Sequence, residues 1–159
     1  MPIMTEGKYR EVVSIDGKNV VLNLPTSPLD GVEVAEGKER LKMLDVFDPK
    51  FRPENYNKAD GAPLRLFDAA SVKIDLSKRS HEDMGFWHRS ADFHEVIICV
   101  QGALRWETEL GAVVLKAGEM ILIPKGITHR SMLCEESAEE NVLLELKVRD
   151  ELEYVGDKK

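Results

Sequence analysis

Residues 85–131 read GFWHRSADFHEVIICVQGALRWETELGAVVLKAGEMILIPKGITHRS, and this stretch decides the fold. It contains three of the chain's four histidines and both of its tryptophans. Glycines separate short runs rich in β-branched residues, and Pro124-Lys125-Gly126 ends the last run. Such runs between turn residues predict antiparallel strands rather than helices, here at 95–100, 104–108, 113–115 and 120–123.

The strand pattern continues on both sides of this stretch. Alternation of apolar and polar residues predicts further strands at 70–76, 128–133 and 142–148. The polar run 77–83 is expected to be a solvated connection. No long amphipathic helix is evident, so the pattern predicts an all-β antiparallel sandwich or barrel.

The N-terminal part has a different organisation. Residues 9–24 predict a β-hairpin, because two β-branched runs flank the turn sequence Asp16-Gly17-Lys18-Asn19. Prolines, asparagines and glycines then indicate a long loop up to Pro63, in which 41–49 could form a short helix or a strand. The expected domain organisation places an N-terminal extension at 1–65, packed on the barrel or on a partner subunit, the barrel at 66–150, and a charged tail at 151–159.

Composition limits the classes of partner. The chain has 159 residues, a net charge of -7 and a pI near 5.2, which argues against nucleic acid or an anionic membrane as the main partner. It contains no apolar run of about 20 residues and no recognisable secretory signal. Its two cysteines, Cys99 and Cys134, suit free thiols in a reducing cytoplasm, where the protein is expected to reside.

Three side chains at expected strand edges are of types that bind metals. Two histidines and one carboxylate, here His88, Glu95 and His129, leave coordination positions open, as in non-haem iron oxygenases. Alternation along the strand that begins at Glu95 turns Ile97 and Cys99 to the same inner side and His94 outward. A carboxylate in an apolar strand needs a partner, which could be a metal or the guanidinium of Arg89 or Arg105. Candidate pocket residues around these ligands are Ser90, Cys99, Arg105 and Trp106.

The spacing of these residues resembles the two signature motifs of the cupin superfamily. The first motif runs from Gly85 through His88-Arg89-Ser90 and Glu95 to Gly102, with Ser90 where cupins carry a second histidine. The second runs from Gly118 through Pro124-Lys125-Gly126 to His129, with Leu133 in place of the final asparagine. The resemblance covers about residues 68–148. It implies a single-domain jelly roll, an antiparallel double-stranded β-helix to which the N-terminal hairpin is added.

Within the cupins, the amino-acid sequence around His88-Arg89 and Ile123-Pro124 is similar to that of the homogentisate dioxygenase branch. That resemblance implies iron(II) held by His88, Glu95 and His129; zinc, nickel, manganese and cobalt also suit such ligands. The dioxygenases of that branch are much longer and have two barrel halves, so activity on homogentisate does not follow.

The sequence therefore predicts a metal-dependent cupin of dioxygenase type that acts on a small organic molecule. Two alternatives stay open: a non-catalytic module that binds a sugar or an organic acid, and a metal-dependent isomerase or lyase. The strand at 96–100 has apolar residues on both faces, so those on the outside of the barrel need another surface to shield them from water. A homodimer would provide that surface, and the hairpin at 9–24 could add a strand to a neighbouring subunit.

Overall fold

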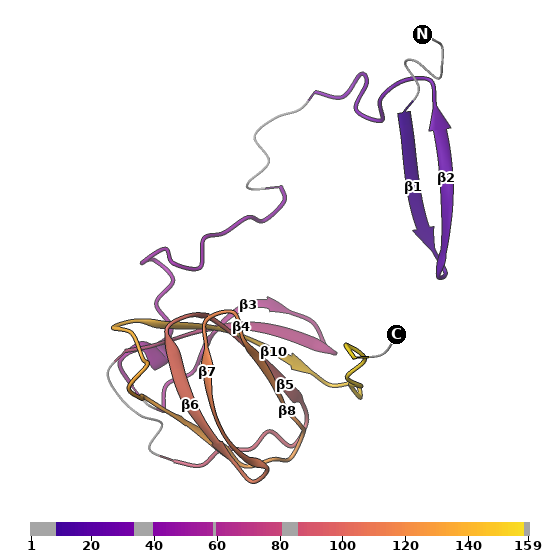
Figure 1. Cartoon of the computed structure of the whole chain (residues 1–159). Helices are drawn as coiled ribbons and strands as arrows, with labels where there is room; N and C mark the ends of the chain where they lie inside the picture. The colour runs from indigo at the N-terminus through magenta and orange to yellow at the C-terminus, as the bar shows by residue number, and fades with distance from the viewer. Residues whose placement is uncertain (1–8, 34–39, 59, 81–85, 158–159) are drawn as a thin grey trace. The chain divides into compact units, whose positions relative to one another are not determined.

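The computed structural model describes residues 9–33, 40–58, 60–80 and 86–157. The chain divides into two compact units, Met1–Leu44 and Asp45–Lys159. The described residues form ten β-strands and one short 3-10 turn, and no α-helix (Figure 1). The predicted all-β class is therefore confirmed. The described residues contain no helix with the length and hydrophobicity needed to cross a membrane. The predicted motif position Gly85 and the histidine His81 lie outside the described residues.

The first unit contains the predicted hairpin. Strands β1 (Tyr9–Ile15) and β2 (Lys18–Leu24) pair antiparallel, with Val12 opposite Val21. Asp16 and Gly17 connect them, and both have positive φ angles, 50° and 73°. A two-residue loop with two positive φ angles matches the right-handed twist of the strands it joins, which explains the aspartate-glycine pair at this point.

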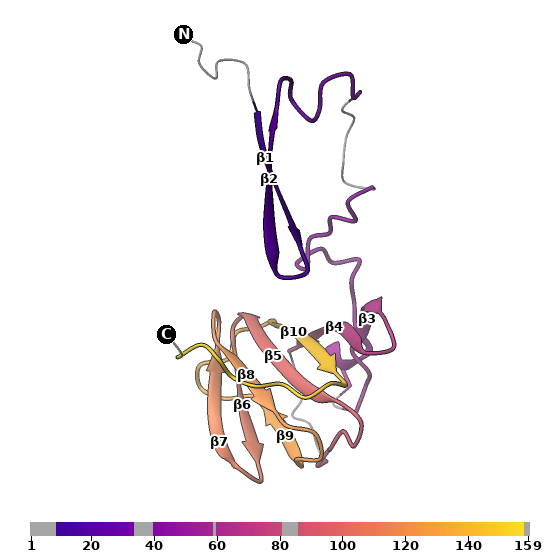
Figure 2. The ribbon, with the colours of Figure 1, turned by 90° about the vertical axis from the view of Figure 1, so that its right-hand side faces the viewer.

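The second unit contains two antiparallel sheets that face each other in the jelly-roll arrangement (Figures 1 and 2). The five-stranded sheet has the order β3-β4-β10-β5-β8 and the three-stranded sheet the order β7-β6-β9. Their bounds are β3 Leu64–Asp68, β4 Val72–Arg79, β5 His94–Gln101, β6 Ala103–Thr108, β7 Gly111–Lys116, β8 Met120–Ile123, β9 His129–Met132 and β10 Asn141–Val148.

The expectation of a solvated connection at 77–83 is wrong for its first three residues. Strand β4 continues to Arg79, and Ser77, Lys78 and Arg79 are all buried. The strand continues because β10 pairs with it along its whole length, from Val148 opposite Val72 to Asn141 opposite Arg79. Polar side chains in a strand are stable when partners across the sheet satisfy them, and sequence periodicity does not show those partners.

Residues 41–49, for which the sequence allowed either a short helix or a strand, form neither in the structure. The only regular element of the loop before β3, among the described residues, is the 3-10 turn η1 (Glu54–Tyr56). Gly61 lies so close to this turn that an added Cβ would approach the Glu54 carbonyl group to 2.6 Å. The buried Asn55 of η1 donates a hydrogen bond from Nδ2 to Ser77 Oγ of β4, at 2.9 Å. The loop is therefore fastened to the rim of the five-stranded sheet.

Apolar side chains from both sheets fill one part of the interior. Ile97, Cys99, Leu143 and Ile123 of the five-stranded sheet pack against Leu104, Trp106 and Leu115 of the other. Glu95, Ile97 and Cys99 are all buried, as strand alternation predicted. This core occupies only part of the space between the sheets, and the remainder is lined by polar groups.

Gly102 closes this core at the turn between β5 and β6. Its φ is +80°, and an added Cβ would lie 2.1 Å from Asn141 Oδ1. That oxygen accepts hydrogen bonds from the Ala103 and Ala138 amides, while Asn141 Nδ2 donates to the Arg79 carbonyl. One buried asparagine thus joins the ends of β4, β6 and β10, and only glycine leaves room for it.

Candidate metal and ligand site

A cavity of about 290 Å³ lies inside the second unit. Its volume is at the lower end of the roughly 300–1,000 Å³ typical of ligand pockets. All three predicted metal ligands line it, together with residues from both sheets and the loop before β3. The complete lining is Asn55, Asp60, Gly61, Ala62, Pro63, Ser77, Arg79, Phe86, His88, Glu95, Leu104, Trp106, His129, Ser131, Leu143, Glu145 and Lys147.

The backbone brings His88 and His129 together, although 40 intervening positions separate them. The His88 amide donates to the His129 carbonyl and the His129 amide donates to the His88 carbonyl, both at 2.8 Å. This two-way pairing places the two side chains on the same face. Their rings lie 5.4 Å apart between centroids and are nearly perpendicular.

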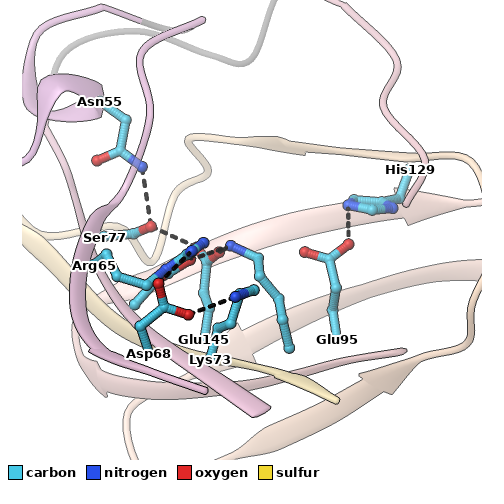
Figure 3. A network of polar contacts seen from close by, with 10 residues as sticks. Asn55, Arg65, Asp68, Lys73, Ser77, Glu95, His129 and Glu145 are labelled. Atoms are coloured by element: carbon cyan, nitrogen blue, oxygen red, sulfur yellow. Dashed lines mark hydrogen bonds and ion pairs between the residues drawn. The ribbon is translucent and has the colours of Figure 1, made fainter. Parts of the chain in front are cut away.

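Glu95 and His129 form the centre of the site. Both are almost completely buried, and Nε2 of His129 lies 3.3 Å from Oε2 of Glu95 (Figure 3). The other ring nitrogen, Nδ1, lies 3.0 Å from the Ile127 carbonyl oxygen, which can only accept a hydrogen bond. Nδ1 therefore carries a proton, and in the neutral ring the lone pair of Nε2 faces the carboxylate.

Two acceptors that face each other in a buried place need a proton or a cation between them. Burial raises the pKa of Glu95, and the negative charge of Glu145 raises it further. Desolvation beside the cavity, followed by the nearby His129 ring, lowers the pKa of His88. A neutral imidazole is the form that binds metals, and a hydrogen bond from the opposite nitrogen to a carbonyl group is the usual way in which a ligand histidine is oriented.

These donors fit a divalent metal in chemical type, and His129 has the orientation of a ligand. In their present side-chain positions, however, no group of three histidine, cysteine, aspartate or glutamate residues in the described part of the chain is arranged to hold an ion. Glu95 and His129 converge, while His88 supplies a third donor of the right type beside them.

A network of charged and polar groups forms the wall next to Glu95 (Figure 3). Lys147 is opposite Glu95 across the β10–β5 pairing, and its Nζ lies 2.6 Å from Asp75 Oδ2 and 3.3 Å from Glu145 Oε1. Arg65 binds the same Asp75 carboxylate through Nε, at 2.6 Å. Glu145 accepts a hydrogen bond from the Ser77 hydroxyl group, which in turn accepts one from Asn55. Every charge in this wall has a partner.

Asp75 gives this network a predictable dependence on pH. Burial alone would raise the pKa of Asp75, but hydrogen bonds from Arg65 and Lys147 lower it. A carboxyl group with a lowered folded-state pKa stabilises the protein above its unfolded pKa of about 3.9, and this contribution is lost as the pH falls through the folded value. We therefore expect the free energy of unfolding, measured with urea between pH 7 and pH 3, to drop below about pH 4. Asp75→Asn should flatten this drop, and an unchanged drop in that variant would contradict the assignment.

The predicted pocket residues lie in different places. Trp106 lines the cavity and also belongs to the apolar core. Cys99 lies in the core, where its thiol faces the Gln101 and Gly102 carbonyls, and neither cysteine is in a disulfide. Arg105 pairs with Glu107, and Ser90 accepts a hydrogen bond from the Phe93 amide. Cys99, Arg105 and Ser90 are not among the residues that line the cavity.

His94, which strand alternation turned outward, is buried outside the cavity. Its Nδ1 accepts a hydrogen bond from the Lys125 amide at 3.0 Å, and its Nε2 lies 3.5 Å from Glu151. The cavity and network residues that the sequence expectation missed include Asp75, Ser77, Arg79, Glu145 and Lys147. Their signal is a period of two in each strand, since Asp75, Ser77 and Arg79 alternate in β4, while Glu145 and Lys147 alternate in β10.

Comparison with known proteins places the second unit in a family. Residues 71–131 match the family model of the AraC-like ligand binding domain. A cupin-2 domain protein from Shewanella frigidimarina NCIMB 400 aligns over 69% of this chain and 98% of its own, with 29% sequence identity and a TM-score of 0.51. The second unit is a cupin-type domain.

Two more distant structures share the cupin fold. One is a proposed mannose-6-phosphate isomerase from Ralstonia eutropha JMP134, with 19% identity, coverage of 68% of this chain and 98% of that chain, and a TM-score of 0.54. The other, of unknown function, comes from Rhizobium leguminosarum bv. viciae 3841, with 16% identity, coverage of 68% and 96%, and a TM-score of 0.53. No curated protein matches this cupin. The resemblance to the homogentisate dioxygenase branch is not tested by these comparisons and stays a prediction.

Proposed function

We propose that this cupin is a divalent-metal-dependent enzyme that oxidises a small organic molecule by dioxygenase-type chemistry. One observation carries the proposal: Glu95 and the Nε2 lone pair of His129 face each other at 3.3 Å inside a cavity, with the opposite nitrogen of His129 already committed to a carbonyl. Cupins commonly bind divalent metals. His88, Glu95 and His129 would hold the ion, and iron(II) is the first metal to test.

A metal bound by these three groups would supply Lewis acidity and open positions for oxygen ligands. The side chains of the cavity would orient the metal ligands, balance their charge and exclude water. Ile127 keeps His129 in the tautomer that presents Nε2, and Lys147 provides positive charge beside Glu95. Asn55 and Ser77 hold Glu145 in place, so that a second carboxylate faces the cavity in a fixed position. Small volume and apolar groups such as Leu104 and Phe86 limit the water that remains around a ligand.

The test needs protein purified without a histidine tag. Elemental mass spectrometry gives the bound metal, and oxygen consumption is then measured with a panel of aromatic diols and thiols. Stoichiometric metal with oxygen uptake on at least one substrate supports the proposal. Turnover without oxygen uptake would instead indicate the isomerase or lyase alternative.

A second candidate function is a non-catalytic module that binds a small organic molecule. The observation in its favour is the match of residues 71–131 to a ligand binding domain rather than to an enzyme family. Such a module would shift its melting temperature with a ligand and turn nothing over. The same substrate panel, followed by thermal unfolding, distinguishes it from the enzyme.

We also propose that the protein is a homodimer through the outer face of its five-stranded sheet. Ile74, Leu146, Val96 and Leu122 follow one another across four strands of this face, and Leu144, Ile98 and Met120 form the next row. Met120 and Leu122 are 60% and 41% exposed. A continuous apolar patch of this kind commonly marks an interface.

Leu122→Glu should therefore convert the dimer to a monomer in size-exclusion chromatography with light scattering. The exposed position means that the fold itself should lose little stability. Leu29→Glu, at a 61% exposed position in the first unit, is the control and should leave the dimer intact. A monomeric starting protein, or a dimer that survives Leu122→Glu, would contradict the proposal.

A further inference from the structure

One end of the cavity presents hydrogen-bond donors rather than acceptors. Arg79 of β4 extends across the interior to β9, where its Nη1 donates to Ser131 Oγ at 2.8 Å. Both residues line the cavity, and they are 4% and 0% exposed. Because the Ser131 oxygen accepts from Arg79, its own proton remains to be donated. Arg79 has five N–H groups in a planar fork and can serve several acceptors at once.

Trp106 adds a third donor beside this pair. It is opposite Ser131 in the β6–β9 pairing, so the two side chains share a face. Trp106 lines the cavity and is 4% exposed, and its indole Nε1 has no hydrogen-bond partner in the described part of the chain. A buried N–H group without a partner is unfavourable, and a ligand with an acceptor would remove that cost.

These donors lie next to the proposed metal ligands. His129 and Ser131 alternate on β9 and both line the cavity, and the rings of Trp106 and His129 are 6.1 Å apart between centroids. A molecule that enters the cavity therefore meets a guanidinium, a hydroxyl and an indole N–H at one end, and the Glu95–His129 pair beside them.

We propose that the cavity binds a small organic carboxylate, with its carboxylate group on Arg79, Ser131 and Trp106. A carboxylate suits this end because it is acceptor-only, has about four lone-pair sites and pairs with guanidinium in a bidentate manner. A neutral polyol or an amide would bring donors, for which these three groups offer only the second lone pair of Ser131 Oγ as an acceptor. The inference rests on the proposed function, since it assigns the ligand class of the same cavity.

The test uses matched pairs of probes in which an amide replaces the carboxylate, so that the charge is lost and an N–H donor group takes the place of one acceptor oxygen: benzoate against benzamide, and lactate against lactamide. Isothermal titration calorimetry with the full chain, with and without added iron(II) or zinc, measures their affinities. At least one carboxylate should bind about tenfold more tightly than its amide, the effect of one hydrogen bond to a charged group. Equal affinity within both pairs, or no binding of any probe, would overturn the inference.

Variants locate the binding site. Ser131→Ala and Trp106→Phe should each weaken carboxylate binding about tenfold and weaken amide binding less, because hydrogen bonds to a charged group are the stronger ones. Ser137→Ala is the matched control, because it also loses a hydrogen bond, to the Ala103 carbonyl, but does not line the cavity. Thermal unfolding of each variant shows whether it is folded. Carboxylate affinity unchanged in both folded cavity variants would refute the assignment.

Metal content separates this inference from the proposed function. Ser131→Ala should keep its full metal content while it loses carboxylate affinity. If no carboxylate preference is found while the metal is bound by Glu95 and His129, only the ligand class is wrong. If the carboxylate binds but no metal is present, only the enzymatic proposal is wrong.

Discussion

His129→Gln should abolish stoichiometric binding of a divalent metal. The substitution removes the Nε2 lone pair that faces Glu95 and the Nδ1 group that Ile127 orients, while it retains a polar side chain of similar length. Changes in groups that only orient a metal ligand already cost 10–100-fold in metal affinity, so loss of the ligand itself should cost at least about 100-fold. Elemental analysis of the purified variant and a metal titration with a competing chelator give the affinity.

His94→Gln is the matched control for this substitution. His94 is also a buried histidine with one nitrogen bonded to the backbone, but it lies outside the cavity. It should retain full metal content even if its stability falls. Glu95→Gln should behave like His129→Gln. Stoichiometric metal in both Glu95→Gln and His129→Gln would remove these residues from the metal site.

Lys147→Met should lower the free energy of unfolding by about 3–5 kcal/mol, the usual cost of breaking a buried ion pair from one side. The Lys147 side chain is 18% exposed and its partner Asp75 only 1%. Burial alone would lower the pKa of Lys147, but Glu145 and Asp75 raise it, so the ammonium group is charged in the folded protein. Its removal leaves Glu145 without its cation and Asp75 with only Arg65.

Lys73→Met provides the comparison, because Lys73 is the partner of Lys147 in the β4–β10 pairing. Lys73 bonds to Asp68, which is 59% exposed, and exposed ion pairs contribute little to stability. Urea unfolding followed by tryptophan fluorescence measures both variants in the second unit, since Trp87 and Trp106 both belong to it. Equal losses in the two variants would show that the buried network does not stabilise the fold.

The spacing of a few residues was sufficient to predict the fold and to select three residues, His88, Glu95 and His129, that line one cavity. Turn residues set the strand lengths, and the expected interval between Pro124-Lys125-Gly126 and His129 located one edge of the cavity. Alternation from Glu95 to Cys99 predicted which side chains face inward, because a strand has only two faces. These signals are local, and sequence displays them directly.

The polar wall could not be predicted in the same way. Ser77 and Arg79 resemble loop residues when only their neighbours in sequence are considered, and their partners Glu145 and Ser131 lie more than 50 positions away. Arg105 was the opposite kind of error, a residue that was predicted to line the pocket and does not. It looked like a pocket cation, but it lies between Leu104 and Trp106 in β6, whose side chains line the cavity, and strict alternation would have turned it outward.

Strand β10 has a consequence for how the protein is made. Among the described strands of the second unit it comes latest in the sequence, yet it lies in the middle of the five-stranded sheet, between β4 and β5. Until Val148 has left the ribosome, β4 and β5 have no common partner. Asp75 is then already outside the ribosome, while Lys147 is still inside the exit tunnel, so their buried ion pair cannot form. The second unit should therefore fold only after its synthesis is almost complete, at the slow rates of folds with distant contacts. A ribosome-stalled chain that ends at residue 140 should be digested by protease, whereas one that exposes residue 157 should resist.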